Sequence, residues 1–253
     1  MQNIINKNAR FNSLLNVETF FCLFILFLIA AKELYGFQHY LDISFFDESE
    51  YIRKGVQLRQ HIFNDWGPSY NLWYFFLFQL TKDATTVFYL NYAILIISVP
   101  SILFLLLVRF KIQRSLALLM CLSLLMHPIL LNSFTYVSHF CLLIILLGFL
   151  ISTYAKHDES KFIIILTALY VCMYARQEFL LPLITVFISW IVFVLRQKKI
   201  RPDYSYLLFI CIVFSLYFIF GFISFKAQGI DRSYFAFMQH FAANYMFWTK
   251  NPI

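Results

Sequence analysis

Two short polar segments, each next to a long apolar run, hold side chains that could do chemistry. The first follows the first apolar run and contains Asp42, Asp47, Glu48 and Glu50. The second lies between two later runs and contains Arg176 and Glu178. A positioned carboxylate can take up a proton, and an arginine can hold an anion through paired hydrogen bonds. Because ionisable groups beside a bilayer are costly to desolvate and usually mark functional sites, both segments are candidate sites.

The composition places both segments in a membrane protein. Of the 253 residues, 61% are hydrophobic and 13% are charged, with a mean hydropathy of +0.73. A soluble domain carries about 25% charged residues. The apolar runs are continuous and rich in Leu, Ile and Phe, and they lack the alternation of a membrane barrel. The sequence therefore predicts an all-α polytopic membrane protein.

The apolar runs predict about seven transmembrane helices. A span needs roughly 20 apolar residues. The runs of suitable length are 14–34, 85–108, 115–131, 134–154, 161–175, 179–195 and 204–225. Segment 69–81 is too short to span comfortably, so we expect it to be an interfacial or re-entrant helix. We expect residues 1–225 to form one transmembrane module, and residues 226–253 to form an exoplasmic C-terminal segment of a truncated or longer protein.

Basic residues in the short loops orient the spans. With a cytoplasmic N-terminus, the basic segments 1–13, 109–114, 155–160 and 196–203 all fall on the inner side. The net acidic first loop, 35–84, then faces the exoplasmic side. The residue usage resembles that of an AT-rich bacterial genome, so we expect this side to be the periplasm at the inner membrane. These loops also account for the net charge of +7 without a nucleic-acid partner.

The cysteines predict neither a zinc site nor a disulfide framework. All of them lie inside apolar runs, and no CxxC pair or Cys/His cluster occurs among Cys22, Cys121, Cys141, Cys172 and Cys211.

The first outer loop has an internal order of its own. Residues 48–63 predict an amphipathic helix on the membrane surface, with Ile52 and Val56 toward the bilayer. Residues 65–68 (Asp-Trp-Gly-Pro) predict a turn, and the aromatic residues of 69–81 predict a helix suited to the interface.

This order resembles the first exoplasmic loop of the GT-C glycosyltransferases. That superfamily includes protein O-mannosyltransferases, aminoarabinose transferases and oligosaccharyltransferase catalytic subunits. An acidic pair after the first span, a tyrosine, a short amphipathic helix, Gly-Pro and an aromatic helix carry the likeness. The matching stretches are Phe46-Asp47-Glu48-Ser49-Glu50-Tyr51 and Asp65-Trp66-Gly67-Pro68-Ser69-Tyr70. The predicted seven-span topology is also similar to the N-terminal module that these enzymes share.

The resemblance implies transfer of a sugar from a polyprenyl-phosphate donor to a glycan, lipid or protein acceptor, with inversion at the anomeric carbon. It gives Asp47 the role of general base, with Glu48 beside it. It places Arg176, with Glu178 close by, on the leaving phosphate. Membrane lipids are the other expected partners. Further candidates for accessory roles are Tyr51, His139 and His240.

The chain also departs from this family. Many members carry a second acidic residue in the outer turn between the third and fourth spans. Here the turn 131–138 contains no carboxylate, and His139 is the nearest substitute. The metal ligands are therefore unknown, and use of a divalent metal stays open.

The same residues allow other interpretations. Asp47 could be a helix N-cap, completed by Glu50 as a capping box. Arg176 and Glu178 could be a structural ion pair. Alternative functions are a polysaccharide polymerase or ligase of the cell envelope, and a non-catalytic carrier or assembly subunit for lipid-linked sugars. A carrier needs ionisable groups near the bilayer midplane, whereas those of this chain cluster at the outer face.

Overall fold

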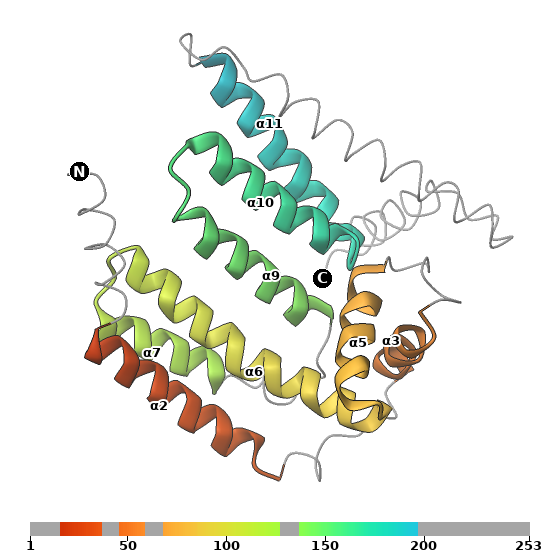
Figure 1. Ribbon diagram of the computed structural model, residues 1–253. Helices are drawn as coiled ribbons and strands as arrows, with labels where there is room; N and C mark the ends of the chain where they lie inside the picture. Colours follow the sequence, from red (N-terminus) through yellow and green to blue (C-terminus); the bar gives the residue numbers. More distant parts are fainter. Residues whose placement is uncertain (1–15, 37–45, 59–67, 127–136, 197–253) are drawn as a thin grey trace, which may run out of the picture. The chain divides into compact units, whose positions relative to one another are not determined.

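A computed structural model describes residues 16–36, 46–58, 68–126 and 137–196, and all secondary structure in these ranges is helical (Figure 1). The α-helices are α2 (Val17–Leu34), α3 (Phe46–Val56), α5 (Pro68–Thr81), α6 (Ala84–Arg109), α7 (Arg114–Leu125), α9 (Val137–Ser152), α10 (Asp158–Met173) and α11 (Leu180–Arg196). A short 3-10 helix, η2 (Gln177–Phe179), precedes α11. The predicted all-α class is confirmed for the described residues.

Most of the predicted segments coincide with helices. The predicted spans correspond to α2, α6, α7, α9, α10 and α11, and the loop segments to α3 and α5. The last predicted span, 204–225, and the boundary at 225 lie outside the described residues. Within the described residues, α6 is the helix that is long and apolar enough to cross a membrane. Shorter apolar helices are present, so seven spans remain a prediction.

The chain divides into two compact units. The first contains residues 1–62 and 66–187, and the second contains 63–65 and 188–253. Every contact described below lies within the first unit. There α6 is the central helix, because it packs against α2, α3, α5, α7 and α9. Helix α10 packs against α9.

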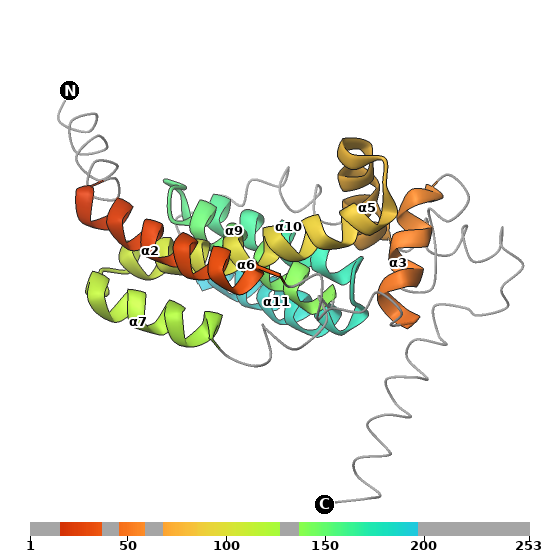
Figure 2. The same cartoon turned by 90° about the horizontal axis from the view of Figure 1, so that it is seen from below.

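A tight turn joins α5 to α6 and so sets the position of α5. Lys82 has a left-handed backbone (φ 59°), and its N–H donates to the Phe78 carbonyl at 2.8 Å. Asp83 then caps α6, because its carboxylate accepts the Thr86 N–H at 2.6 Å. Helices α3 and α5 consequently lie together beside the first turns of α6 (Figures 1 and 2).

The opposite end of α6 gathers basic residues. The Arg109 guanidinium donates to the Thr153 hydroxyl and carbonyl, each at 3.2 Å, and lies 4.8 Å from the Tyr154 ring centre. Arg114 forms an ion pair with Glu18 at 2.9 Å. The predicted inner loops 109–114 and 155–160 thus lie at one end of these helices, while α3 and α5 lie at the other.

The amphipathic helix α3 packs differently from the expectation. Ile52 does not face outward, because it is 5% exposed in a cluster with Tyr70 and Tyr74 of α5, and the half-buried Val56 packs against the same cluster. The expected bilayer-facing position of Ile52 is therefore wrong. The aromatic side chains of α5 offer α3 an apolar partner within the protein, which the pattern of α3 alone did not reveal.

Helices α9 and α10 approach closely at a glycine. A Cβ added to Gly148 would lie 2.6 Å from the Cβ of Ala168, closer than real side chains come. Small residues at such a crossing let two backbones pack tightly, which is a common basis of helix association in membranes.

We expect Gly148→Ala to destabilise the protein by about 1–3 kcal/mol, because the added methyl group overpacks this crossing. Combining it with Ala168→Gly should recover most of the loss, since the clashing atom is removed. Unfolding by denaturing detergent in micelles measures both variants against Ala168→Gly alone. If the double variant loses the sum of the two single losses, the close approach is not the cause.

Candidate functional site

Glu48 is a buried carboxylate at the junction of three helices. The residue is 4% exposed, although it lies in a helix with several charged neighbours. Its Oε1 atom accepts hydrogen bonds from the hydroxyl groups of Tyr70, at 2.7 Å, and Tyr74. Because an unpaired buried charge is strongly unfavourable, these bonds are needed to keep the carboxylate in this position.

Helix α6 completes the network around Glu48. The side-chain amide of Asn91 donates to the hydroxyl oxygens of Tyr70, at 3.1 Å, and Tyr74, at 2.9 Å. The Trp73 indole N–H donates to the Asn91 carbonyl oxygen at 2.7 Å. This last bond defines which end of the amide faces the tyrosines, because an indole nitrogen can only donate.

Both phenols of the network are held in their neutral form. Burial is the largest cause, and with the neighbouring negative charge of Glu48 it raises the pKa of Tyr70 and Tyr74 well above the usual value. The two hydroxyl groups therefore remain hydrogen-bond donors over the physiological pH range.

Helical spacing brings these side chains together. Glu48, Ile52 and Gly55 recur at intervals of three and four on α3, and Tyr70 and Tyr74 are four residues apart on α5. A Cβ on Gly55 would lie 2.5 Å from the Cβ of Tyr74, so the glycine allows the two helices to approach. This close approach puts the Glu48 carboxylate within reach of both hydroxyl groups.

Asp47 lies in the first turn of α3, one residue before Glu48. The helix begins at Phe46, so the predicted N-cap position of Asp47 is wrong. Glu50 does not complete a capping box either, because its oxygens accept from Arg53, at 2.7 Å, and Lys54, at 3.2 Å. The hydrogen bond from Arg53 is the main cause that lowers the Glu50 pKa to about 2. The side chain of Asp47 lies outside the described part.

Arg176 lies after the end of α10 and beside the start of α9. Its guanidinium donates to the Ser138 hydroxyl and to Glu178 at 3.4 Å, so the predicted pairing with Glu178 is confirmed. The guanidinium side chain is 35% exposed and that of Glu178 is 57% exposed. His139 follows Ser138 in the first turn of α9 and is half-buried.

One cluster connects the two candidate segments. Tyr51, buried on α3, contacts the Tyr70 ring edge-on at a centroid distance of 5.0 Å. The Tyr70 ring also contacts Phe140 of α9 at 5.4 Å, and the Ser69 N–H donates to the Tyr174 carbonyl at 3.4 Å. Tyr174 is two residues before Arg176. The acidic helix and the arginine therefore lie at the same end of the helices, while His240 lies outside the described residues.

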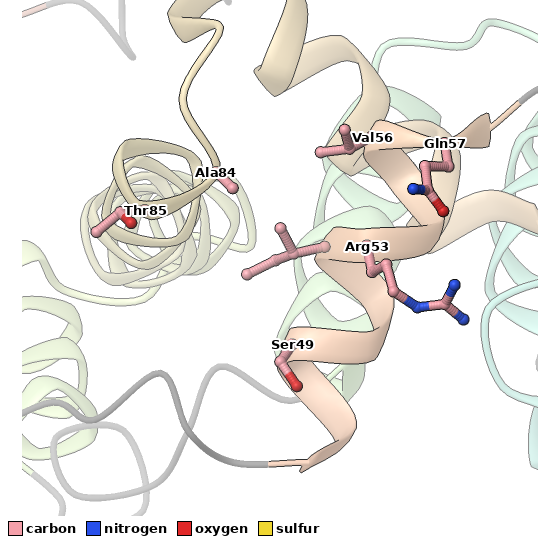
Figure 3. A pocket seen from close by; sticks show the side chains of 7 residues that line it. Ser49, Arg53, Val56, Gln57, Ala84 and Thr85 are labelled. Atoms are coloured by element: carbon pink, nitrogen blue, oxygen red, sulfur yellow. The ribbon is translucent and has the colours of Figure 1, made fainter.

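A shallow groove lies between α3 and the start of α6. Its volume is about 350 Å³, and it is lined by Ser49, Ile52, Arg53, Val56, Gln57, Ala84 and Thr85. Figure 3 shows the Arg53 guanidinium extending away from Ala84 and Thr85, in agreement with its pairing to Glu50. The groove is thus mainly apolar and offers no free charge for an anionic ligand.

The sequence interpretation missed Tyr70, Trp73, Tyr74 and Asn91. Asn91 was the available signal, because it is a polar residue inside the long apolar helix α6.

In the described part of the chain, no three His, Cys, Asp or Glu side chains come together as metal ligands. Comparisons with protein-family models, curated proteins and solved structures find no match for this chain.

We expect Gly55→Ala to separate α3 from α5 and to destabilise the protein by about 1–3 kcal/mol, because the new Cβ would overlap Tyr74. The thermal unfolding midpoint in detergent should fall, and Trp73 fluorescence should change as the indole loses its ordered surroundings. Gln57→Ala, at an exposed position one residue after the end of this helix, is the control and should leave both unchanged. Equal behaviour of the two variants would contradict the proposed close packing.

Proposed function

We propose that this chain is an integral-membrane glycosyltransferase of the GT-C type. It takes a sugar from a polyprenyl-phosphate donor and transfers it to a cell-envelope acceptor at the periplasmic face. The observation that carries the proposal is that the acidic helix α3 and the segment of Arg176 both contact α5 and lie at the same end of the helices. This arrangement agrees with the roles that the sequence resemblance assigns.

The surface of α2 supports placement in a membrane. Its exposed side chains are large and apolar, including Phe20, at 73% exposed, Phe21, Phe24, Phe27 and Leu28. Contiguous apolar surface of this kind is unfavourable in water and is expected where a helix faces lipid. The length and composition of α6 agree with the same environment.

In the proposed reaction, the carboxylate of Asp47 takes the proton of the acceptor hydroxyl. The acceptor oxygen attacks the anomeric carbon from the side opposite the phosphate, and the bond from that carbon to the phosphate oxygen breaks. The phosphate leaves with the bonding electron pair. Inversion follows from this geometry.

Arg176 is the proposed cation for the leaving phosphate. Its guanidinium is partly exposed and has one neutral and one acidic partner, Ser138 and Glu178. Charge that develops on phosphate oxygens is stabilised by such a group, and a planar guanidinium can bind two oxygens at once. Glu178 orients the guanidinium, and it would compete with phosphate if it approached more closely.

We expect Asp47→Asn to abolish transfer from a panel of polyprenyl-phosphate sugars in liposomes, because the amide cannot accept the proton. Glu50→Gln is the matched control: it removes a carboxylate three residues further along the same helix, and transfer should persist. Arg176→Lys should lower kcat by about 10²–10³-fold, as expected on losing a stabilising donor. Full activity of well-folded Asp47→Asn protein would rule out the assigned base.

The proposed orientation of the chain in the membrane gives a second prediction. Cysteines placed at Tyr35 and Lys82 should react with a membrane-impermeant maleimide from the periplasmic side, and those at Lys111 and Lys156 only after permeabilisation. The reason is that α5 does not cross the membrane and the basic loops lie inside. Labelling of Lys82 and Tyr35 from opposite sides would show that α5 crosses, and would contradict the proposed sidedness.

A further inference from the structure

We propose that Glu48, Tyr70, Trp73, Tyr74 and Asn91 form a positioning network that holds Glu48 as an anion and thereby fixes the first turn of α3, including Asp47. The sequence resemblance assigns no role to Tyr70, Trp73, Tyr74 or Asn91. The role toward Asp47 rests on the proposed function, whereas the charge state of Glu48 and the fixing of α3 can be tested without any substrate.

The direction of the hydrogen bonds makes Glu48 an acceptor. Trp73 donates to the Asn91 oxygen, so the amide nitrogen of Asn91 faces the tyrosines. Its two protons go to the hydroxyl oxygens of Tyr70 and Tyr74. Each hydroxyl then has its own proton left to donate.

Glu48 is the acceptor on which these protons converge. The Tyr70 hydroxyl lies 2.7 Å from the carboxylate and 3.5 Å from the Tyr74 hydroxyl, so the carboxylate is the closer acceptor. Two donors on Oε1 leave no room for a proton on that oxygen. An ionised carboxylate accepts both hydrogen bonds more strongly than a neutral carboxyl group does, and it is the state assigned to Glu48 in the proposal.

The network joins three helices through one group. Glu48 belongs to α3, Tyr70, Trp73 and Tyr74 to α5, and Asn91 to α6. Since the hydrogen bonds are directional, they restrict the rotation of α3 about its axis and its shift along that axis more than apolar packing does. Asp47 is the preceding residue in the same helical turn, so its backbone position follows that of Glu48.

Glu48 is in this view a positioning residue and not a proton carrier. It is buried, and its carboxylate oxygen is already occupied by two donors. A general base must come within hydrogen-bonding distance of the acceptor, and a displacement of about 1 Å can cost roughly 100-fold in rate. The network supplies this positioning from outside the substrate's reach.

Infrared difference spectroscopy at neutral pH tests the charge state. Subtracting the spectrum of Glu48→Gln from that of the unmodified protein should reveal an ionised carboxylate band. Tyr70→Phe and Tyr74→Phe should each shift this band, because each removes one donor. Tyr170→Phe is the matched control, since its hydroxyl bonds to the Tyr174 hydroxyl, and the band should stay in place.

Spin-label distances test the position of α3. Labels at the exposed sites Gln57 and Lys156 should give a narrow distance distribution in the unmodified protein and in Tyr170→Phe. The distribution should broaden in the Tyr70→Phe/Tyr74→Phe double variant, which keeps both aromatic rings. In transfer assays the same double variant should lose about 100-fold in kcat with little change in KM.

The outcomes separate this inference from the proposed function. A protonated-carboxyl band for Glu48 would overturn the network. It would also be overturned if both tyrosine substitutions left the carboxylate band and the distance distribution unchanged. If the band and the distances behave as expected but no donor supports transfer by any form of the protein, the network stands and the glycosyltransferase proposal fails.

Discussion

The buried charge of Glu48 is the constraint on which the candidate site depends. Helix α3 has 11 residues and a mixed, largely polar sequence, and an isolated helix of that length is marginal in water. Its place must therefore come from tertiary contacts. The carboxylate provides them because it can be buried only where Tyr70 and Tyr74 meet it, and Gly55 provides the space. Removing either tyrosine hydroxyl would take one donor from the buried carboxylate, and a side chain at Gly55 would overlap Tyr74.

The two ends of the described helices use polar residues in different ways. At the end with the basic loops, Arg109 and Arg114 bind neighbouring helices through Thr153 and Glu18, and these bonds lie partly in solvent. At the other end, Glu48 and Asn91 are buried and hydrogen-bonded to the same two tyrosines. Exposed ion pairs contribute little to stability, whereas a buried network specifies one arrangement. The end with Glu48 and Asn91 is thus the one where side-chain hydrogen bonds fix how the helices are arranged.

Much of the fold was predictable because it depends on local patterns. Continuous apolar runs predicted α2, α6 and α9 to α11 close to their observed bounds, and the aromatic segment predicted α5. What could not be predicted depends on pairs of helices. The face of α3 that carries Ile52 looks suitable for a bilayer in isolation, and the structure packs it on α5 instead. For the same reason, the sequence of α5 alone predicts interfacial tyrosines, because the partners of their hydroxyl groups, Glu48 and Asn91, lie on other helices.

The candidate site shows the same division. The acidic pair and Arg176 are visible in the sequence as isolated polar residues beside apolar runs, but the sequence does not show that Glu48 is buried. In a helix, consecutive residues are about 100° apart, so two adjacent carboxylates cannot share one face. Glu48 occupies the buried stripe with Ile52 and Gly55, and the adjacent position 47 belongs to another stripe of the helical register. If the chain transfers sugars as proposed, the adjacency of the two acids reflects two tasks in one turn: Glu48 holds the helix, and Asp47 is left to react.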